Sequence, residues 1–171
     1  MRIVFRARDD LLARVRRDLA RPHPFAHERI GFLVCRAARL TLGGIAILAA
    51  EYEPVADEDY LENPDVGAMI GSDAIRKALQ RAYNGGAGDL SMFHVHMHGH
   101  RGRPGFSDVD TREYRRFVPD FFNVAPGMPH GAVVLSVDQA IGICWPSPER
   151  EPVHVARFAG VGAPLLFWWR R

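Results

Sequence analysis

Histidine alternates with apolar residues in the run His94-Val95-His96-Met97-His98. A period of two is typical of a β-strand, in which successive side chains point to opposite faces of the sheet. The three histidines are therefore expected on one face of a strand over residues 90–98. Because every buried imidazole needs hydrogen-bond partners, a strand face lined with histidines is a poor core element. The fold of this chain must therefore give the histidine face a role other than packing in the core.

The rest of the pattern predicts a mixed α/β domain. Apolar and β-branched residues between turn signals predict strands over residues 3–5, 30–36, 40–52, 131–137, 140–145 and 153–158. Helical spacing of apolar residues predicts helices that begin at Asp9 or Asp10, at Ser72, and at Ser107 or Asp108, and that end near Ala20, Tyr83 and Phe117. Residues 54–67 and 99–105 are expected as loops. No repeat or linker divides the chain, so residues 1–171 are expected to form one domain.

The bulk composition narrows the function. The chain has 22 Lys and Arg against 20 Asp and Glu, and a net charge of +2 does not favour nucleic acid as the main partner. Cys35 and Cys144 lie in apolar runs and are expected to be buried thiols in a reducing compartment, without the spacing of a cysteine zinc site. With no signal peptide and no apolar stretch of 18 residues, we expect a soluble, cytoplasmic protein without a membrane partner.

The histidine strand is a good platform for a metal ion. Neutral imidazole suits Zn²⁺, and two histidines two residues apart can bind the same ion. Asp110 follows after the bend Gly102-Arg103-Pro104-Gly105 and is expected to return to the histidines as a third ligand. Two His and one carboxylate leave a fourth position for water, which is the pattern of a catalytic site. Ser107 is expected either as a plain helix cap or as a hydroxyl that stabilises an oxyanion.

These residues resemble the signature of the JAMM (MPN+) zinc metalloproteases, which is His-x-His, a short loop and Ser-x-x-Asp. In that family a Glu on an earlier strand, often in the setting Glu-x-x-Gly, is the general base. Glu28-Arg29-Ile30-Gly31 looks like this element, and the order of expected strands and helices also matches over residues 1–145. The resemblance implies a curved mixed β-sheet flanked by helices, with a JAMM/MPN-like (cytidine-deaminase-like) core, and a catalytic role for Glu28 and Ser107.

The register of the histidine pair departs from the family pattern. Seven residues usually separate the second His from the Ser, whereas eight intervene here for the pair 96/98, ten for 94/96 and six for 98/100. Gly99 also stands where the family has Pro. We choose His96 and His98 with Asp110 as the ligands of one Zn²⁺, because this pair needs a one-residue adjustment and ends a strand. His94 is the alternative ligand, and His94 and His100 otherwise lie beside the site.

The resemblance implies a deubiquitinase-like isopeptidase or peptidase of the bacterial type, which cleaves after the C-terminus of a ubiquitin-like protein. Its expected partners are that protein, its conjugates and other proteins of the conjugation pathway. Two other classes stay open: a zinc-dependent hydrolase of a small-molecule amide, and a non-catalytic scaffold of the MPN type. A deaminase is not favoured, because its signature needs a closely spaced Cys pair.

The other polar and aromatic residues are weaker candidates. His23, His27 and His130 are expected on the surface, with His27 beside the cleft, and residues 57–59 are expected to form a solvated acidic loop. The tryptophans are expected in the core or docked on the domain. They are Trp145, Trp168 and Trp169.

Overall fold

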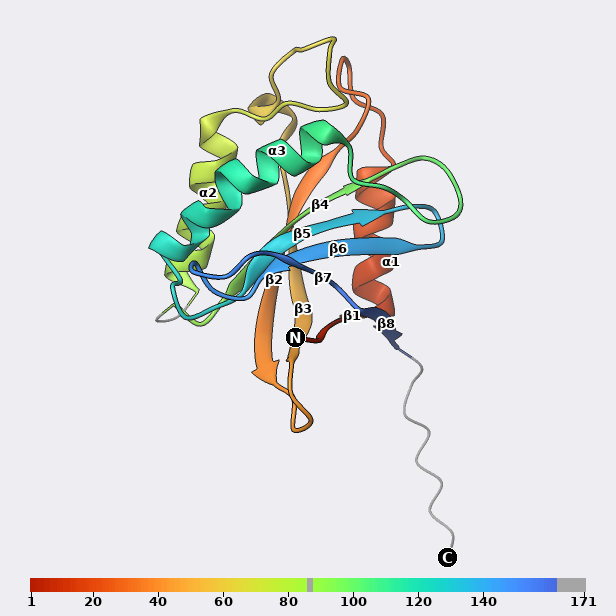
Figure 1. The fold of residues 1–171 in the computed structure, drawn as a ribbon. Helices are drawn as coiled ribbons and strands as arrows, with labels where there is room; N and C mark the ends of the chain where they lie inside the picture. The colour runs from red at the N-terminus through yellow and green to blue at the C-terminus, as the bar shows by residue number, and fades with distance from the viewer. Residues whose placement is uncertain (86–87, 163–171) are drawn as a thin grey trace, which may run out of the picture.

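The computed structural model describes residues 1–85 and 88–162, which form a mixed α+β domain built on one curled sheet (Figure 1). The eight strands of the sheet are β1 Ile3–Arg8, β2 Ile30–Arg39, β3 Ile45–Pro54, β4 Ser91–Met97, β5 His130–Leu135, β6 Ala140–Trp145, β7 Val153–His154 and β8 Arg157–Val161. The three α-helices in these residues are α1 Asp9–Leu19, α2 Ser72–Asn84 and α3 Asp108–Phe117. Two short 3₁₀ helices are η1 Asp57–Asp59 and η2 Val118–Asn123. None of the helices in the described part of the chain is long and apolar enough to cross a membrane.

The strand order is β7-β6-β5-β4-β2-β3-β1-β8, and the sheet is mixed. β4 and β5 run parallel, as do β1 and β3 and also β1 and β8, whereas the remaining neighbours are antiparallel. The two edge strands β7 and β8 are consecutive in the chain. Val155 donates a backbone hydrogen bond to Gly142 of β6, and the next residue, Ala156, donates one to Ile3 of β1. The sheet therefore has to curl until its two edges almost meet.

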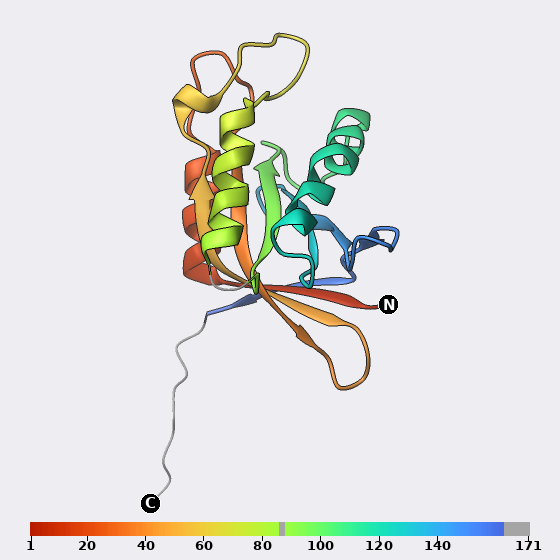
Figure 2. The same cartoon turned by 90° about the vertical axis from the view of Figure 1, so that its left-hand side faces the viewer.

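Alternation along β4 separates two different environments. Phe93 and Val95 point to the face covered by α1, where they join the core cluster of Val15 and Leu19. Met92 points to the opposite face, which α2 and α3 cover in Figures 1 and 2. Since side chains alternate, the histidines of β4 share the face of α2 and α3. The sequence expectation of one histidine face is thus confirmed for His94 and His96, whereas His98 follows the end of β4 at Met97.

Two expected strands differ from the structure in ways that the backbone explains. The strand expected over residues 40–52 begins only at Ile45, because Gly43 and Gly44 have φ values of 84° and 105° and form a turn. The single strand expected over 153–158 is wrong. The chain changes from one edge of the sheet to the other at residues 155 and 156, so it forms β7 and β8 instead.

The helix caps were predicted with mixed success. Ser107 caps α3, as expected. Ser72 is not a cap, since Gly71 holds the N-cap position and Ser72 is the first helical residue of α2. Arg8 likewise precedes α1, so Asp9 and Asp10 lie in its first turn, where their charges favour the helix dipole. Docking of the C-terminal segment with Trp168 and Trp169 lies outside the described residues.

Candidate metal centre

His96 and His98 lie together at the end of β4. Their Nε2 atoms are 3.2 Å apart. Two nitrogen ligands at about 2.0–2.1 Å from a tetrahedral zinc ion would be separated by about 3.3 Å, so this spacing fits a shared ion. His98 follows the last residue of the strand, and its backbone N–H still bonds to Leu135 of β5. The two rings are thus held by the sheet itself. The side chain of His96 is 3 % exposed and that of His98 is 21 % exposed, so solvent reaches the pair from the His98 side.

Glu28 reaches the same point from the segment before β2. The antiparallel pairing of β2 with β4 sets Ile30 opposite His96, so Glu28 comes to lie beside His98. One Glu28 oxygen is 3.7 Å from His98 Nε2, and the other is 4.0 Å from His96 Nε2. Among the described residues, Glu28, His96 and His98 form a group that could hold a metal ion, with ligand atoms within 4.8 Å of one another.

The electrostatics around Glu28 suit a proton acceptor. Burial raises the pKa of Glu28 above its ordinary value, and the nearby charge of Asp110 raises it further, although His98 opposes this. A carboxylate with a raised pKa is a better general base near neutral pH than an ordinary surface glutamate. The side chain remains 32 % exposed, so water can reach it.

The neighbouring Arg29 anchors this segment. Its guanidinium is 3 % exposed and pairs with Asp57 of η1 at 2.6 Å. The same guanidinium donates to the carbonyl oxygens of Arg21 and Pro22. The acidic run at residues 57–59 is therefore not a purely solvated loop, since Asp59 also pairs with Lys77. These contacts fix the chain that carries Glu28.

Asp110 approaches the pair from α3. Its Oδ2 atom accepts hydrogen bonds from the backbone N–H of Ser107 at 2.9 Å and from the Ser107 hydroxyl at 2.8 Å. This leaves Oδ1 to face His96 Nε2, at 3.7 Å. Asp110 lies outside the compact group formed with Glu28, although it is nearer to His96 Nε2 than Glu28 is. The structure thus offers two carboxylates, on different sides of the histidine pair.

Ser107 forms a full capping box with Asp110. The Ser107 oxygen also accepts from the Asp110 backbone N–H at 3.0 Å, so it satisfies one of the free donors at the start of α3. Both roles expected for Ser107 use the same hydroxyl. The cap needs its oxygen as an acceptor, whereas oxyanion stabilisation needs its proton, which points to Asp110 here.

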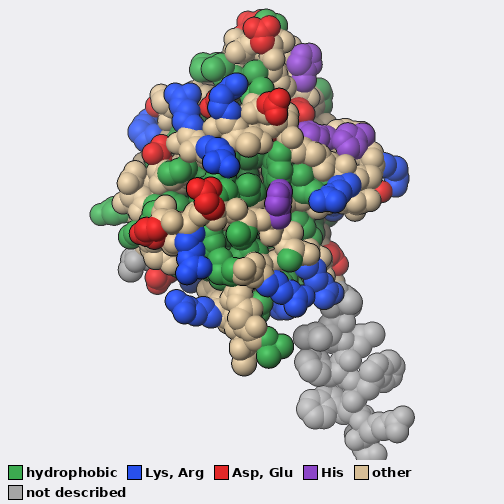
Figure 3. Space-filling view, in the orientation of Figure 1, with side chains coloured by type: hydrophobic (Ala, Val, Ile, Leu, Met, Phe, Trp, Pro, Cys, Tyr) green, Lys and Arg blue, Asp and Glu red, His purple; other side chains and the backbone are tan. Residues whose placement is uncertain are grey.

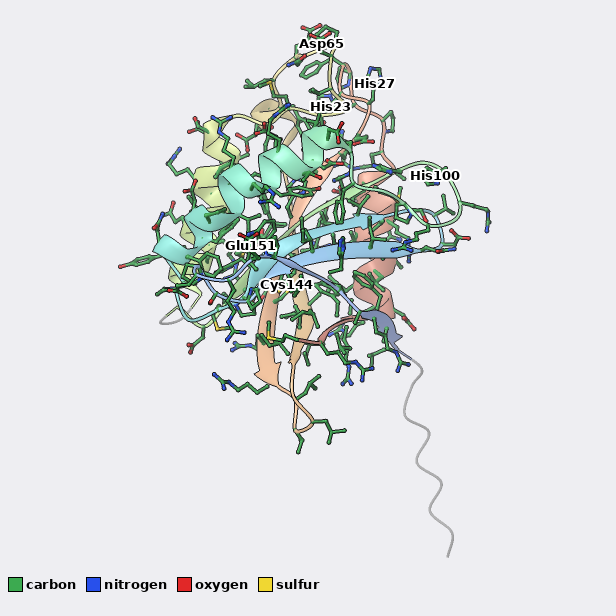
Figure 4. The ribbon with its side chains drawn as sticks, in the orientation of Figure 1. His23, His27, Asp65, His100, Cys144 and Glu151 are labelled. Atoms are coloured by element: carbon green, nitrogen blue, oxygen red, sulfur yellow. The ribbon has the colours of Figure 1, made fainter. Side chains whose placement is uncertain are left out.

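The two remaining histidines of the run lie on either side of the pair. His94 is buried among the rings of Phe32, Tyr114 and Phe117, and its Nδ1 has no hydrogen-bond partner in the described residues. His100 is exposed and lies on a loop at the same end of the molecule as His27 (Figure 4). Neither belongs to the compact group with Glu28. This arrangement favours the register 96/98 over 94/96 and 98/100. Figure 3 shows several histidine side chains on the surface of the molecule.

Sequence reasoning missed two residues of the site. The Tyr114 hydroxyl is 3.0 Å from Nδ1 of His96. Its spacing of four residues from Asp110 on a helix was a signal that the two share a face. Gly67 packs against Glu28, where an added Cβ would lie 2.8 Å from Oε2, and its carbonyl accepts from the backbone N–H groups of His27 and Glu28. No local signal in the sequence identifies Gly67.

Other expectations can be checked away from the metal centre. Cys35, Cys144 and Trp145 are buried, as expected. The surface position expected for His130 is wrong. Its ring is fully buried between Phe121 and Phe122, accepts from the Met92 backbone N–H and faces the Ala125 carbonyl at 3.0 Å. The neighbouring Pro129 suggested a surface position, but His130 is the first residue of the buried strand β5.

A cavity of about 620 Å³ lies on the opposite face of the sheet, against α1. Its lining includes Val15 and Arg16 of α1 and Phe158 of β8, and none of the candidate metal ligands. The cavity and the candidate metal centre are therefore separate features.

No model of a known protein family matches this chain, and no curated protein matches it.

Proposed function

We propose that this protein is a zinc-dependent peptidase of the JAMM type, which cleaves the peptide or isopeptide bond after the C-terminus of a ubiquitin-like protein. The observation that carries the proposal is the approach of Glu28 to two imidazole nitrogens that lie 3.2 Å apart. Asp110 lies beside the same pair and supplies a second carboxylate. The proposed centre needs two carboxylates, since one binds the metal and the other accepts a proton.

The donor set fits zinc. Imidazole nitrogen and carboxylate oxygen are its common ligands, and His96, His98 and Asp110 would hold the ion while leaving one position open. A zinc ion in such a site lowers the pKa of bound water towards about 7 and polarises a carbonyl group. We assign the third ligand to Asp110 because Glu28 is more exposed and has the raised pKa of a base.

The remaining chemistry belongs to the protein. Glu28 accepts a proton from the water that attacks the scissile carbonyl carbon. It then delivers this proton to the amine nitrogen as the carbon–nitrogen bond breaks. Ser107 donates a hydrogen bond to the oxygen that becomes negative in the tetrahedral intermediate, and releases Asp110 Oδ2 to do so. The products are a carboxylic acid and a free amine.

The fold and the surface are compatible with this substrate. The curled mixed sheet, with the histidine strand near its centre, supports the JAMM/MPN-like core that we propose. The substrate's extended tail would lie beside the end of β4. Residues 54–67 would flank this tail, since Gly67 contacts Glu28. Figure 4 shows that the loop with Asp65 lies next to the loop with His27. Proteins of a conjugation pathway in the cytoplasm are the proposed partners.

The proposal is tested with the purified full chain. Zinc content is measured by elemental analysis, and a ubiquitin-like protein fused to a reporter is incubated with the protein, with and without a chelator. We expect about one zinc per chain and cleavage that stops with chelator and returns with added zinc. Zinc without cleavage of any ubiquitin-like fusion would support a small-molecule amide hydrolase instead. A chain that binds no zinc would support a non-catalytic scaffold.

A further inference from the structure

We propose that the cavity between the sheet and α1 binds a small molecule with an apolar body and one carboxylate, and that the Arg16 guanidinium pairs with this carboxylate. The volume of the cavity is about 620 Å³, within the range of about 300–1,000 Å³ that is typical of small-molecule sites. None of the candidate metal ligands lines it, so the proposal does not depend on zinc or on the cleavage of a ubiquitin-like protein.

The walls of the cavity are mostly apolar and come from distant parts of the chain. α1 contributes Leu12 and Val15, whereas the sheet contributes Leu135 of β5 and Phe158 of β8. Leu12 and Phe158 pack against the core but remain partly exposed. A ligand that covers these side chains removes apolar surface from water, which favours binding. The walls therefore fit the apolar body of the ligand.

Arg16 is the most buried of the charged residues that line the cavity. It is half-buried, whereas the other two arginines of the lining, Arg103 and Arg157, are exposed. The Nε atom of Arg16 is buried and has no hydrogen-bond partner among the described residues. A buried donor without an acceptor is costly, and a guanidinium can bind a carboxylate through two N–H groups at once. A carboxylate bound in the cavity would satisfy this donor.

The two aspartates of the lining do not supply the missing acceptor. Asp138 accepts a hydrogen bond from the backbone N–H of Gly102 at 2.8 Å. Asp9 lies against Gly160 of β8 and is about two turns before Arg16 on α1, which is about 10 Å along the helix axis. Since Asp9 and Arg16 both line the cavity, it is long enough for a straight chain such as that of decanoate.

The experiment measures binding to the full chain by isothermal titration calorimetry. The probes are decanoate, the neutral decan-1-ol and the cationic decylamine, with a chelator present so that no metal ion binds the carboxylate. We expect one decanoate per chain, and binding of the other two probes that is weaker by about tenfold or more.

Arg16→Met tests the role of the cation, because it keeps an unbranched side chain in the wall and removes the charge. We expect decanoate binding to weaken by about 10- to 100-fold and decan-1-ol binding to stay the same. Arg17→Met is the matched control, since Arg17 is the next residue of α1, is exposed and does not line the cavity. It should bind decanoate like the wild type. Equal decanoate affinity of the wild type and Arg16→Met would refute the pairing with Arg16.

Ala140→Phe tests the location of the site. Ala140 is half-buried and lines the cavity, so the added ring should fill it and prevent decanoate binding. A folded Ala140→Phe protein, checked by its melting temperature, that still binds decanoate would place the probe elsewhere and overturn the proposal. Decan-1-ol that binds the wild type as tightly as decanoate would overturn the carboxylate preference, and no binding of any probe would refute the site. Decanoate binding by a chain that holds no zinc and cleaves no fusion would refute the proposed function alone.

Discussion

The backbone of Gly67 lies directly against the carboxylate of Glu28, so closely that a Cβ at residue 67 would be 2.8 Å from Oε2 and 2.9 Å from Cδ. The contacted atoms are the flexible end of a side chain, so Gly67→Ala would push the carboxylate away while the backbone stays in place. We expect cleavage of a ubiquitin-like fusion to fall at least about tenfold, since small misplacements of a catalytic group are costly. Zinc content and melting temperature should stay near those of the wild type.

Gly127→Ala is the control for this substitution, because nothing lies within 4 Å of its added Cβ. It should keep full activity. If Gly67→Ala cleaved the fusion at the wild-type rate, Glu28 would either move without consequence or have no part in the reaction.

Glu28→Gln tests the general base directly. Glutamine keeps the size of the side chain but cannot accept the proton, so we expect the cleavage rate to fall by about 10²- to 10⁴-fold. Zinc binding should persist if Asp110 is the third ligand, and elemental analysis checks this. A zinc-free Glu28→Gln protein would instead identify Glu28 as a ligand, which its distances of 3.7 and 4.0 Å to the histidine nitrogens also permit.

The histidine register can be decided by removing single rings. His98→Ala should reduce zinc content to background, because it removes one of the two Nε2 atoms that lie 3.2 Å apart. His100→Ala should retain zinc, since the His100 ring is exposed and contacts the Arg101 carbonyl instead. The reverse result in elemental analysis would favour the register 98/100 or another site.

Ser107→Ala removes a cap and a hydroxyl donor together. Loss of the cap should lower the free energy of unfolding by about 1 kcal/mol, measured by denaturant titration. If Ser107 also stabilises the oxyanion, the cleavage rate should fall by about 10²- to 10³-fold, more than such a stability loss explains. Ser107→Thr retains the hydroxyl and should keep most of both properties. An alanine variant that loses stability but keeps its rate would leave Ser107 as a cap only.

The burial of His130 should make the free energy of unfolding of the zinc-free protein depend on pH. Burial lowers the pKa of His130 to about 4, below the 6.5 of an ordinary histidine. The unfolded chain therefore gains a proton first as pH falls, and stability is lost between about pH 6.5 and 4, by at most about 1.4 kcal/mol per pH unit. His94 and His96, whose pKa values are also lowered by burial, act with the same sign. In a His130→Asn variant, the free energy of unfolding, measured by denaturant titration, should fall less steeply between pH 6.5 and 4. An unchanged dependence on pH would contradict the role of His130.

Local sequence patterns determined much of the fold. The alternation in β4 correctly predicted one histidine face, because side-chain direction in a strand depends only on the parity of the residue number. The cap at Ser107 was also readable, since the capping box is made within four residues. By contrast, the split of residues 153–158 into β7 and β8 depends on backbone partners in β6 and β1, which lie far away in the chain.

The sequence by itself therefore determined the side-chain types of the candidate site and the face of the strand on which the histidines lie. Only the tertiary structure decided which groups meet. The pairing of β2 with β4 brings Glu28 to His98, and Gly67, in the loop before α2, limits where the Glu28 carboxylate can lie. The packing of α3 on the histidine face sets the Tyr114 hydroxyl beside His96. Such contacts join residues far apart in the chain, and local spacing carries no information about distances of that kind.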